Sequence, residues 1–164
     1  SDAYAVDPQT LKVTRWTESE TGGLDPARNA EPELIEVKSF DGEAVSGFLY
    51  RPDPQRFPGK RPVIVNIHGG PESQTRPGFL GGKRFVSLDN GPFKREDSVK
   101  DIGAFLDRLA ADPRIDAERM GVTGGSYGGY MCYASAIRYN TRFDGALCVV
   151  AISNFNTFLE NTQS

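Results

Sequence analysis

The second part of the chain alternates short apolar runs with longer amphipathic segments, and this order limits the fold more than any other feature. The first run, RPVIVNI, begins at Arg61 and is almost continuously apolar, which is typical of a strand covered on both faces of a parallel sheet. The next segment predicts a helix that closes at Pro113, because its apolar residues recur at helical spacing: Val99, Ile102, Phe105, Leu106 and Leu109.

Three further segments continue the alternation. A short strand is predicted from about Arg119 to Thr123, a helix over YMCYASAIRYN, and another buried strand over GALCVVAIS. The resulting order of strand, helix, strand, helix and strand predicts an α/β fold, with a mostly parallel sheet flanked by helices.

Two antiparallel hairpins are predicted before this region. One consists of two short strands around the turn-forming sequence DPQT, and the other of two longer strands around an Asp-Gly dipeptide. Between them lies a stretch rich in glycine, proline and charge, which indicates a linker. We therefore divide the chain into a terminal hairpin (1–21), a linker (22–32) and an α/β domain (33–164).

Composition argues against several classes of partner. The formal net charge is −3 and no basic stripe appears, so we expect no nucleic-acid partner. The longest apolar run, around residues 147–153, is far too short to cross a bilayer, so we expect no membrane partner. We interpret Cys132 and Cys148 as buried free thiols, because a disulfide scaffold normally has denser cysteines, and no clustered Cys/His spacing indicates a metal. Cytoplasm and periplasm are both compatible with the sequence.

The sequence GGSYG, residues 124–128, matches the G-x-S-x-G pattern of a nucleophile elbow. In an elbow the serine, here Ser126, occupies a strained turn between a strand and a helix, and both elements are predicted at this point. Gly124 and Gly128 then let the neighbouring backbone approach without a Cβ clash. A phosphate-binding loop of the Walker type would need Gly-Lys-Ser/Thr, which is absent.

A second motif, His68-Gly69-Gly70-Pro71, follows the first apolar run. Acyl transfer creates an oxyanion that two backbone N–H groups can stabilise, one from the residue after the nucleophile and one from an HGG-type loop. We nominate Tyr127 and Gly70 as these donors. His68 is the chain's single histidine, but it precedes Ser126, whereas the base follows the serine in this hydrolase order. We expect His68 and Gly69 to shape the loop.

These motifs together resemble those of the prolyl oligopeptidase family of serine peptidases, and most closely its dipeptidyl and acylaminoacyl peptidase branch. The likeness is carried by HGGPESQTRP, by GVTGGSYGGYM and by the helical segment GPFKREDSVKDIGAFLDRLAADPRID. The resemblance implies an α/β-hydrolase fold, a preceding β-propeller whose last strands are the terminal hairpin, and hydrolysis of short peptides through an acyl-enzyme at Ser126. It implies no cofactor.

The chain departs from the family pattern in two ways. Nothing in the chain matches the family's aspartate and histidine, so we expect a remaining part of the same enzyme or a second chain to supply them, and the hydrolase fold here to be incomplete. The segment PGFLGGKRFVSL reads as if a helix and a strand were missing between Gly81 and Gly82. Two alternatives stay open at this point: a carboxylesterase of the same fold, and a hydrolase-like module that binds without cleaving.

Overall fold

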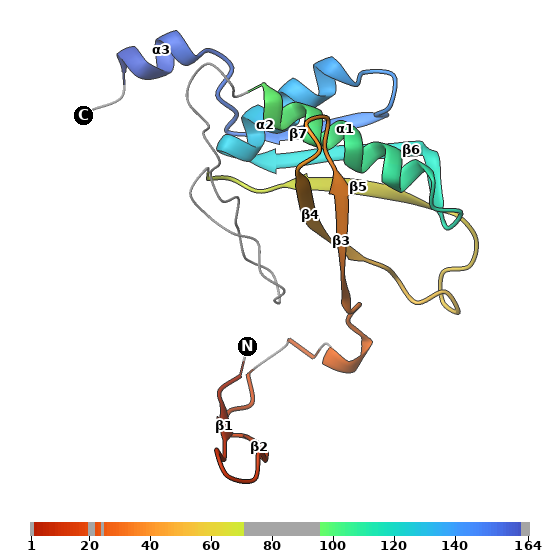
Figure 1. The fold of residues 1–164 in the computed structure, drawn as a ribbon, viewed down its shortest axis with the longest axis vertical. Helices are drawn as coiled ribbons and strands as arrows, with labels where there is room; N and C mark the ends of the chain where they lie inside the picture. The colour runs from red at the N-terminus through yellow and green to blue at the C-terminus, as the bar shows by residue number, and fades with distance from the viewer. Residues whose placement is uncertain (1, 20–21, 24, 71–95, 162–164) are drawn as a thin grey trace.

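A computed structural model describes residues 2–19, 22–23, 25–70 and 96–161 of the chain. Two antiparallel hairpins are followed by a three-stranded parallel sheet with helices packed against it (Figure 1). The proposed break between Gly81 and Gly82 lies outside the described residues. No helix among the described residues has the length and apolar character needed to cross a bilayer.

The first hairpin pairs β1 (Tyr4–Val6) with β2 (Val13–Arg15), as the sequence predicts. Its turn is held by the side chain of Asp7, whose Oδ1 accepts the backbone N–H groups of Gln9 and Thr10 at 2.8 and 2.9 Å. This Asx-type turn is the local chemistry that the DPQT sequence predicts. In Figure 1 the hairpin stands apart from the parallel sheet.

The second hairpin pairs β3 (Pro32–Lys38) with β4 (Ala44–Tyr50), again as predicted. Gly42 in its turn has φ of 88°, a conformation that glycine adopts without strain. A short 3-10 helix, η1 (Pro26–Arg28), precedes the hairpin within the predicted linker. The hairpin packs on the first α-helix of the sheet region, where a Cβ at Gly47 would lie 3.3 Å from the Phe105 ring.

The parallel sheet has the strand order β5 (Arg61–Ile67), β6 (Ile115–Gly125) and β7 (Gly145–Val149). Parallel neighbours need crossover connections, and α1 (Asp97–Ala110) and α2 (Tyr127–Arg138) supply them. The predicted order of strands and helices is therefore confirmed. β6 is longer than the predicted strand, since it begins at Ile115 rather than Arg119.

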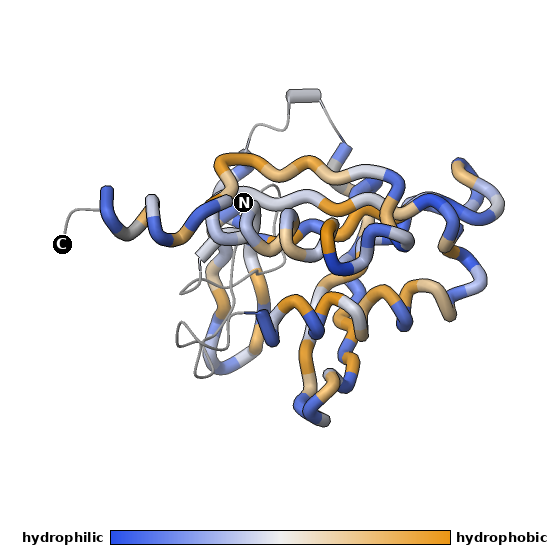
Figure 2. Tube along the Cα trace, turned by 90° about the horizontal axis from the view of Figure 1, so that it is seen from above, coloured by the Kyte–Doolittle hydropathy of each residue, from blue (hydrophilic) through white to orange (hydrophobic). Residues whose placement is uncertain are grey.

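The core lies between one face of this sheet and the two helices. Both α1 and α2 contact β6, and apolar and polar residues alternate along the helical turns, as the orange and blue stretches of Figure 2 show. The apolar side of each helix faces the strands. The most deeply buried members of the resulting cluster are Leu106, Met120, Met131 and Cys132.

The opposite face of the sheet corrects one prediction. β5 and β7 are predicted to be covered on both faces, yet Ile64 is 71% exposed and Leu147 is 67% exposed. Alternate residues of a strand point to opposite sides, so the residues beside these two face the helices while Ile64 and Leu147 face away from them. Within the described part of the chain, the prediction of buried strands holds for one face only.

The last helix, α3 (Phe155–Glu160), is not among the elements predicted from the sequence. Its N-cap is Asn154, whose side-chain Oδ1 accepts the N–H groups of Asn156 at 3.0 Å and Thr157 at 3.2 Å. An asparagine before a short apolar segment is the signal that predicts such a start. The helix spans six residues, too few for a periodic pattern to reveal it.

Candidate active site

Ser126 occupies the junction between β6, which ends at Gly125, and α2, which begins at Tyr127. Its backbone has φ of 58° and ψ of −123°, and its side chain is exposed. A positive φ in a residue with a Cβ costs on the order of 1–3 kcal/mol and persists only where the surroundings enforce it. The serine thus sits on a strained strand-to-helix turn, the geometry that a nucleophile elbow requires.

Close backbone contacts surround this turn and explain two of its glycines. A Cβ at Gly124 would lie 2.2 Å from the carbonyl oxygen of Gly128, and a Cβ at Gly128 would lie 2.1 Å from the carbonyl oxygen of Ile67. Both distances are far shorter than any real contact of a Cβ. The strand β5, the strand β6 and the helix α2 can therefore meet here only through glycine.

The backbone of Ser126 is held on the β7 side as well. Its N–H donates to the carbonyl oxygen of Val149 at 3.1 Å, and its own carbonyl oxygen accepts the N–H of Tyr130 at 3.1 Å. The first turn of α2 comes so close to β7 that a Cβ at Gly129 would lie 2.6 Å from the same Val149 oxygen. The strained turn is thus fixed between β5 on one side and β7 on the other.

The sheet register brings the two glycine-rich loops to the same edge. Ile67 is paired with Gly124, so His68-Gly69-Gly70 and the serine turn both leave the carboxyl edge of the sheet. The first residues of a helix have N–H groups that the helix itself does not use, and Tyr127 is the first residue of α2. The assignment of Gly70 and Tyr127 as oxyanion donors stays a prediction.

The imidazole of His68 is bound within its own loop. Its Nδ1 lies 2.6 Å from the carbonyl oxygen of Gly69. Because a carbonyl oxygen can only accept, Nδ1 carries the proton and donates it in this bond. The bond ties the ring to the neighbouring peptide. That His68 and Gly69 shape the loop stays a prediction.

A row of aromatic rings extends from the serine turn, and the sequence analysis did not single it out. Tyr127 and Tyr130 have ring centroids 5.7 Å apart, Tyr130 and Phe155 4.9 Å, and Phe155 and Phe158 6.5 Å. The row joins α2 to α3. Its signal in the sequence is the spacing of three between Tyr127 and Tyr130 and between Phe155 and Phe158, which places the two rings on one side of their helix in each case.

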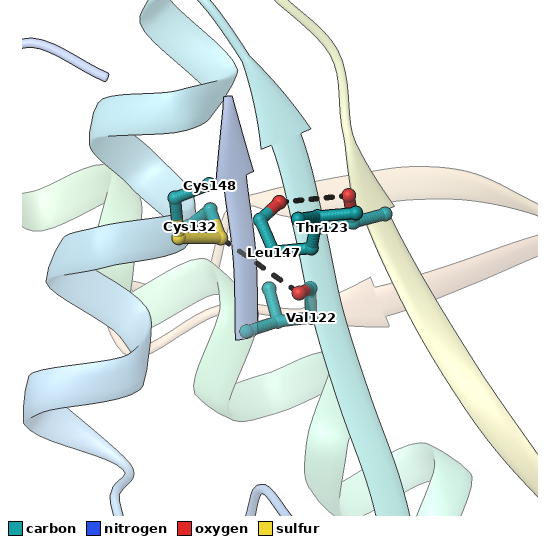
Figure 3. Close-up of a disulfide and its surroundings, with 5 residues drawn as sticks. All are labelled: Val122, Thr123, Cys132, Leu147 and Cys148. Carbon is teal, nitrogen blue, oxygen red and sulfur yellow. Dashed lines mark hydrogen bonds between the residues drawn. A yellow bond between two sulfur atoms is a disulfide. The ribbon is translucent and has the colours of Figure 1, made fainter. Parts of the chain in front are cut away.

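The prediction that the two cysteines are free thiols is wrong. Cys132 of α2 and Cys148 of β7 form a disulfide, shown in Figure 3, and are not free thiols. The low number of cysteines argued against a scaffold of several bridges, but it does not argue against a single one. The bridge spans 16 residues of sequence, and a loop of that length corresponds to about 3 kcal/mol of stabilisation in the chain-entropy description.

The strongest electrostatic perturbation lies at the other edge of the sheet. Hydrogen bonds from the side chain and backbone of Arg114, and a further one from Arg51, hold the pKa of Asp112 well below its usual range. These residues flank the amino ends of β5 and β6, whereas Ser126 follows the carboxyl end of β6. This perturbation is therefore structural. Among the described residues, no group of three or more His, Cys, Asp and Glu is arranged to hold a metal ion.

Comparison with known proteins gives a consistent result. The prolyl oligopeptidase family matches residues 89–164. The chain is 32% identical over 150 residues to the uncharacterized peptidase YuxL of Bacillus subtilis, covering 77% of this chain and 23% of YuxL. It is 28% identical over 148 residues to human dipeptidyl peptidase 8, covering 71% of this chain and 16% of that protein.

Two solved structures show the same fold. The acylaminoacyl peptidase of Pyrococcus horikoshii superposes with a TM-score of 0.62 at 24% identity, over 88% of this chain and 27% of its own. A puromycin-hydrolyzing peptidase of Mycobacterium tuberculosis superposes with a TM-score of 0.65 at 16% identity, over 99% of this chain and 29% of its own. The α/β-hydrolase fold expected from the sequence is confirmed.

This chain spans about a quarter of the length of YuxL and of the two solved structures. The family match covers the segment that includes α1, β6, the serine turn and α2. Through residues 89–164, the chain matches the prolyl oligopeptidase family.

Proposed function

We propose that this chain carries the nucleophile of a serine peptidase, and that Ser126 forms an acyl-enzyme with short peptides. The observation that carries the proposal is the backbone of Ser126, which holds φ of 58° on a turn between strand and helix while its side chain stays exposed. Strain of this kind clusters at functional sites. A glycine-rich turn without a chemical role has no need of a strained, exposed serine.

In the proposed reaction, Oγ of Ser126 attacks the carbonyl carbon of the peptide bond and a histidine takes its proton. The N–H groups of Gly70 and Tyr127 bind the negative oxygen that forms. Collapse of this intermediate breaks the C–N bond, and the histidine returns the proton to the departing amine. Water then attacks the carbonyl carbon of the ester while the histidine takes its proton. The histidine returns this proton to Oγ as the ester bond breaks, which frees Ser126.

The histidine and the aspartate that orients it are assigned to residues outside this sequence. His68 donates from Nδ1 to the oxygen of Gly69, and it precedes the serine in the chain. Residues 33–164 are then part of a hydrolase domain, residues 22–32 its connection, and the β1–β2 hairpin the end of a propeller-like domain. A larger polypeptide or a second chain completes the triad.

The aromatic row favours substrates with an apolar side chain. Tyr127 and Phe158 lie at its two ends, and Phe158 is 44% exposed. Apolar and aromatic surface next to a nucleophile binds apolar groups of a substrate. We assign this row to the substrate side chain near the bond that is cleaved.

A fluorophosphonate probe tests the proposal on the full-length protein. We expect one covalent adduct at Ser126, lost in Ser126→Ala and retained in Ser153→Ala, which removes another exposed serine at the same edge of the sheet. We expect His68→Gln to retain the adduct as well, because the proposed base lies outside this sequence. Absence of an adduct in folded, full-length protein favours the non-catalytic module.

A peptidase and a carboxylesterase differ in the leaving group they accept. We expect the protein to cleave an aminoacyl anilide, whose leaving group is an amine, at a rate comparable with that for a matched ester. The named relatives are peptidases, which favours this outcome. Turnover of the ester alone would assign the site to the carboxylesterase alternative.

A further inference from the structure

The disulfide lies directly behind the serine turn. Ser126, Gly129 and Cys132 recur every third residue along α2, so they share one side of the helix, and each one meets β7. Ser126 donates its N–H to Val149, Gly129 has no room for a Cβ because of the same Val149 oxygen, and Cys132 is bonded to Cys148. The disulfide thus joins β7 at Cys148, one residue before Val149, whose carbonyl oxygen accepts the N–H of Ser126.

We propose that the Cys132–Cys148 disulfide is a redox-controlled latch that positions Ser126. In the oxidised protein it presses the first turns of α2 against β7 and keeps the acceptor Val149 in register with the Ser126 N–H. Reduction releases this constraint and lets the strained turn relax. The effect on catalysis rests on the proposed function, whereas the effect on the backbone does not.

β7 needs such a constraint more than β6 does. It is five residues long, and among the described strands it pairs with β6 alone. Its other attachments to β6 are modest: Oγ1 of Thr123 donates to the oxygen of Leu147 at 2.9 Å, and Asp144 exchanges hydrogen bonds with the backbone of Met120. A strained residue persists only when several contacts enforce it, and a strand of five residues supplies few.

The reduced protein has a folded state available to it. A dithiol gives two electrons and two protons to the disulfide, which becomes two thiols while the dithiol becomes a cyclic disulfide. Sγ of Cys132 lies 3.8 Å from the carbonyl oxygen of Val122. That sulfur has no hydrogen while it is bonded to Cys148, but as a thiol it donates to this oxygen. Reduction therefore changes the latch without leaving Cys132 unpaired.

Access to the bond is asymmetric. Cys132 is fully buried, whereas Cys148 is only partly buried. An attacking thiolate therefore reaches Sγ of Cys148 first and forms the mixed disulfide there, with Cys132 as the leaving thiolate.

Hydrogen exchange at single amides tests the latch in the full-length protein. We expect dithiothreitol to speed exchange of the Ser126 and Tyr130 amides at least tenfold more than exchange of Leu106 in α1. In Cys132→Ala/Cys148→Ala the two amides should exchange fast, with or without dithiothreitol. An equal acceleration of all amides would show a bridge that stabilises the fold without positioning Ser126, and would overturn the proposal.

Two further measurements make the test decisive. Thiol titration of the non-reduced, denatured protein should find no free thiol from these two cysteines, and finding both would overturn the proposal. Reduction should lower kcat at least threefold and leave KM within twofold, since the turn rather than the substrate surface changes. A protein that is inactive in both redox states but shows the exchange difference would contradict the proposed function and leave the latch supported.

Discussion

Arg51 and Asp112 form a hydrogen-bonded ion pair that joins the end of β4 to the loop between α1 and β6, with Nη2 of Arg51 2.7 Å from Oδ2 of Asp112. Oδ1 of Asp112 also accepts from Nε of Arg114 at 3.1 Å and from its backbone N–H at 3.0 Å. The Asp112 side chain is 3% exposed. One carboxylate thus connects the second hairpin to the parallel sheet.

We expect Asp112→Asn to lower the free energy of unfolding at pH 7 by about 2 kcal/mol, because it weakens the charge-assisted bonds from Arg51 and Arg114 and leaves Glu33 as the carboxylate that pairs with Arg51. The pKa of Asp112 is lowered in the folded protein, mainly by Arg114, so its ionised form stabilises the fold above its ordinary pKa of 3.8. The difference between variant and wild type should shrink as the pH falls below about 4. Urea denaturation of both proteins between pH 7 and about pH 4 and below measures this difference in the free energy of unfolding.

Asp116→Asn is the matched control for this substitution. Asp116 also accepts from an arginine, Arg119 at 2.7 Å, but the Arg119 side chain is 60% exposed and the pair connects neighbours on the surface. Exposed pairs of this kind contribute little to stability. A loss for Asp116→Asn as large as that for Asp112→Asn would contradict the role given to Asp112.

Asp101 has the opposite pH dependence. Burial raises its pKa, the negative charges of Asp41 and Asp97 add to the rise, and the hydrogen bond from Ser39 only partly opposes it. The folded protein therefore holds the Asp101 proton more tightly than the unfolded chain, and this contribution to stability is lost as the pH rises through the raised pKa. We expect Asp101→Asn to raise the melting temperature at pH 7 and to have a smaller effect at pH 4. A lower melting temperature at pH 7 would contradict the burial argument.

Gly128 and Gly125 offer a matched pair at the serine turn. A Cβ at Gly128 would lie 2.1 Å from the carbonyl oxygen of Ile67, whereas the nearest atom of the described residues to a Cβ at Gly125, the carbonyl oxygen of Val149, is 4.0 Å away. We expect Gly128→Ala to cost about 3 kcal/mol and to abolish labelling of Ser126, because backbone must move. Gly125→Ala should change stability by less than about 1 kcal/mol. Calorimetry and probe labelling of both variants measure the contrast.

Phe158→Ala tests the aromatic row. Removal of the exposed end of the row should raise KM for substrates with a large apolar side chain and leave kcat within about twofold, because binding rather than the serine turn is changed. The control is Phe57→Ala, which removes another exposed phenylalanine from the loop between β4 and β5. An equal effect of both substitutions on KM would argue against a substrate site at the row.

The intact mass of the denatured protein tests the assignment of the missing histidine and aspartate. We expect a mass well above 17.9 kDa, the value for this sequence, since the proposed base and its partner lie outside it. A mass of 17.9 kDa would require a second chain to supply both residues. Efficient hydrolysis by a 17.9 kDa protein alone would contradict the mechanism.

Much of the architecture follows from local patterns. The apolar run of β5, the helical spacing in α1 and the glycines around Ser126 each depend on residues within about a dozen positions, so the sequence alone predicts the strands, the two long helices and the serine turn. The resemblance of the motifs also predicts the family. Short α3 escaped prediction, because six residues are too few for periodicity.

The tertiary structure decided what depends on distant residues meeting. Cys132 and Cys148 form a bond because the crossover through α2 lays the helix against β7, and no spacing rule for a sequence separation of 16 requires it. Arg51 and Asp112, 61 positions apart, likewise meet because the fold brings the end of β4 next to the loop between α1 and β6. The sequence determined which elements form, since propensity and periodicity are local. The contacts between elements depend on packing that no local pattern encodes.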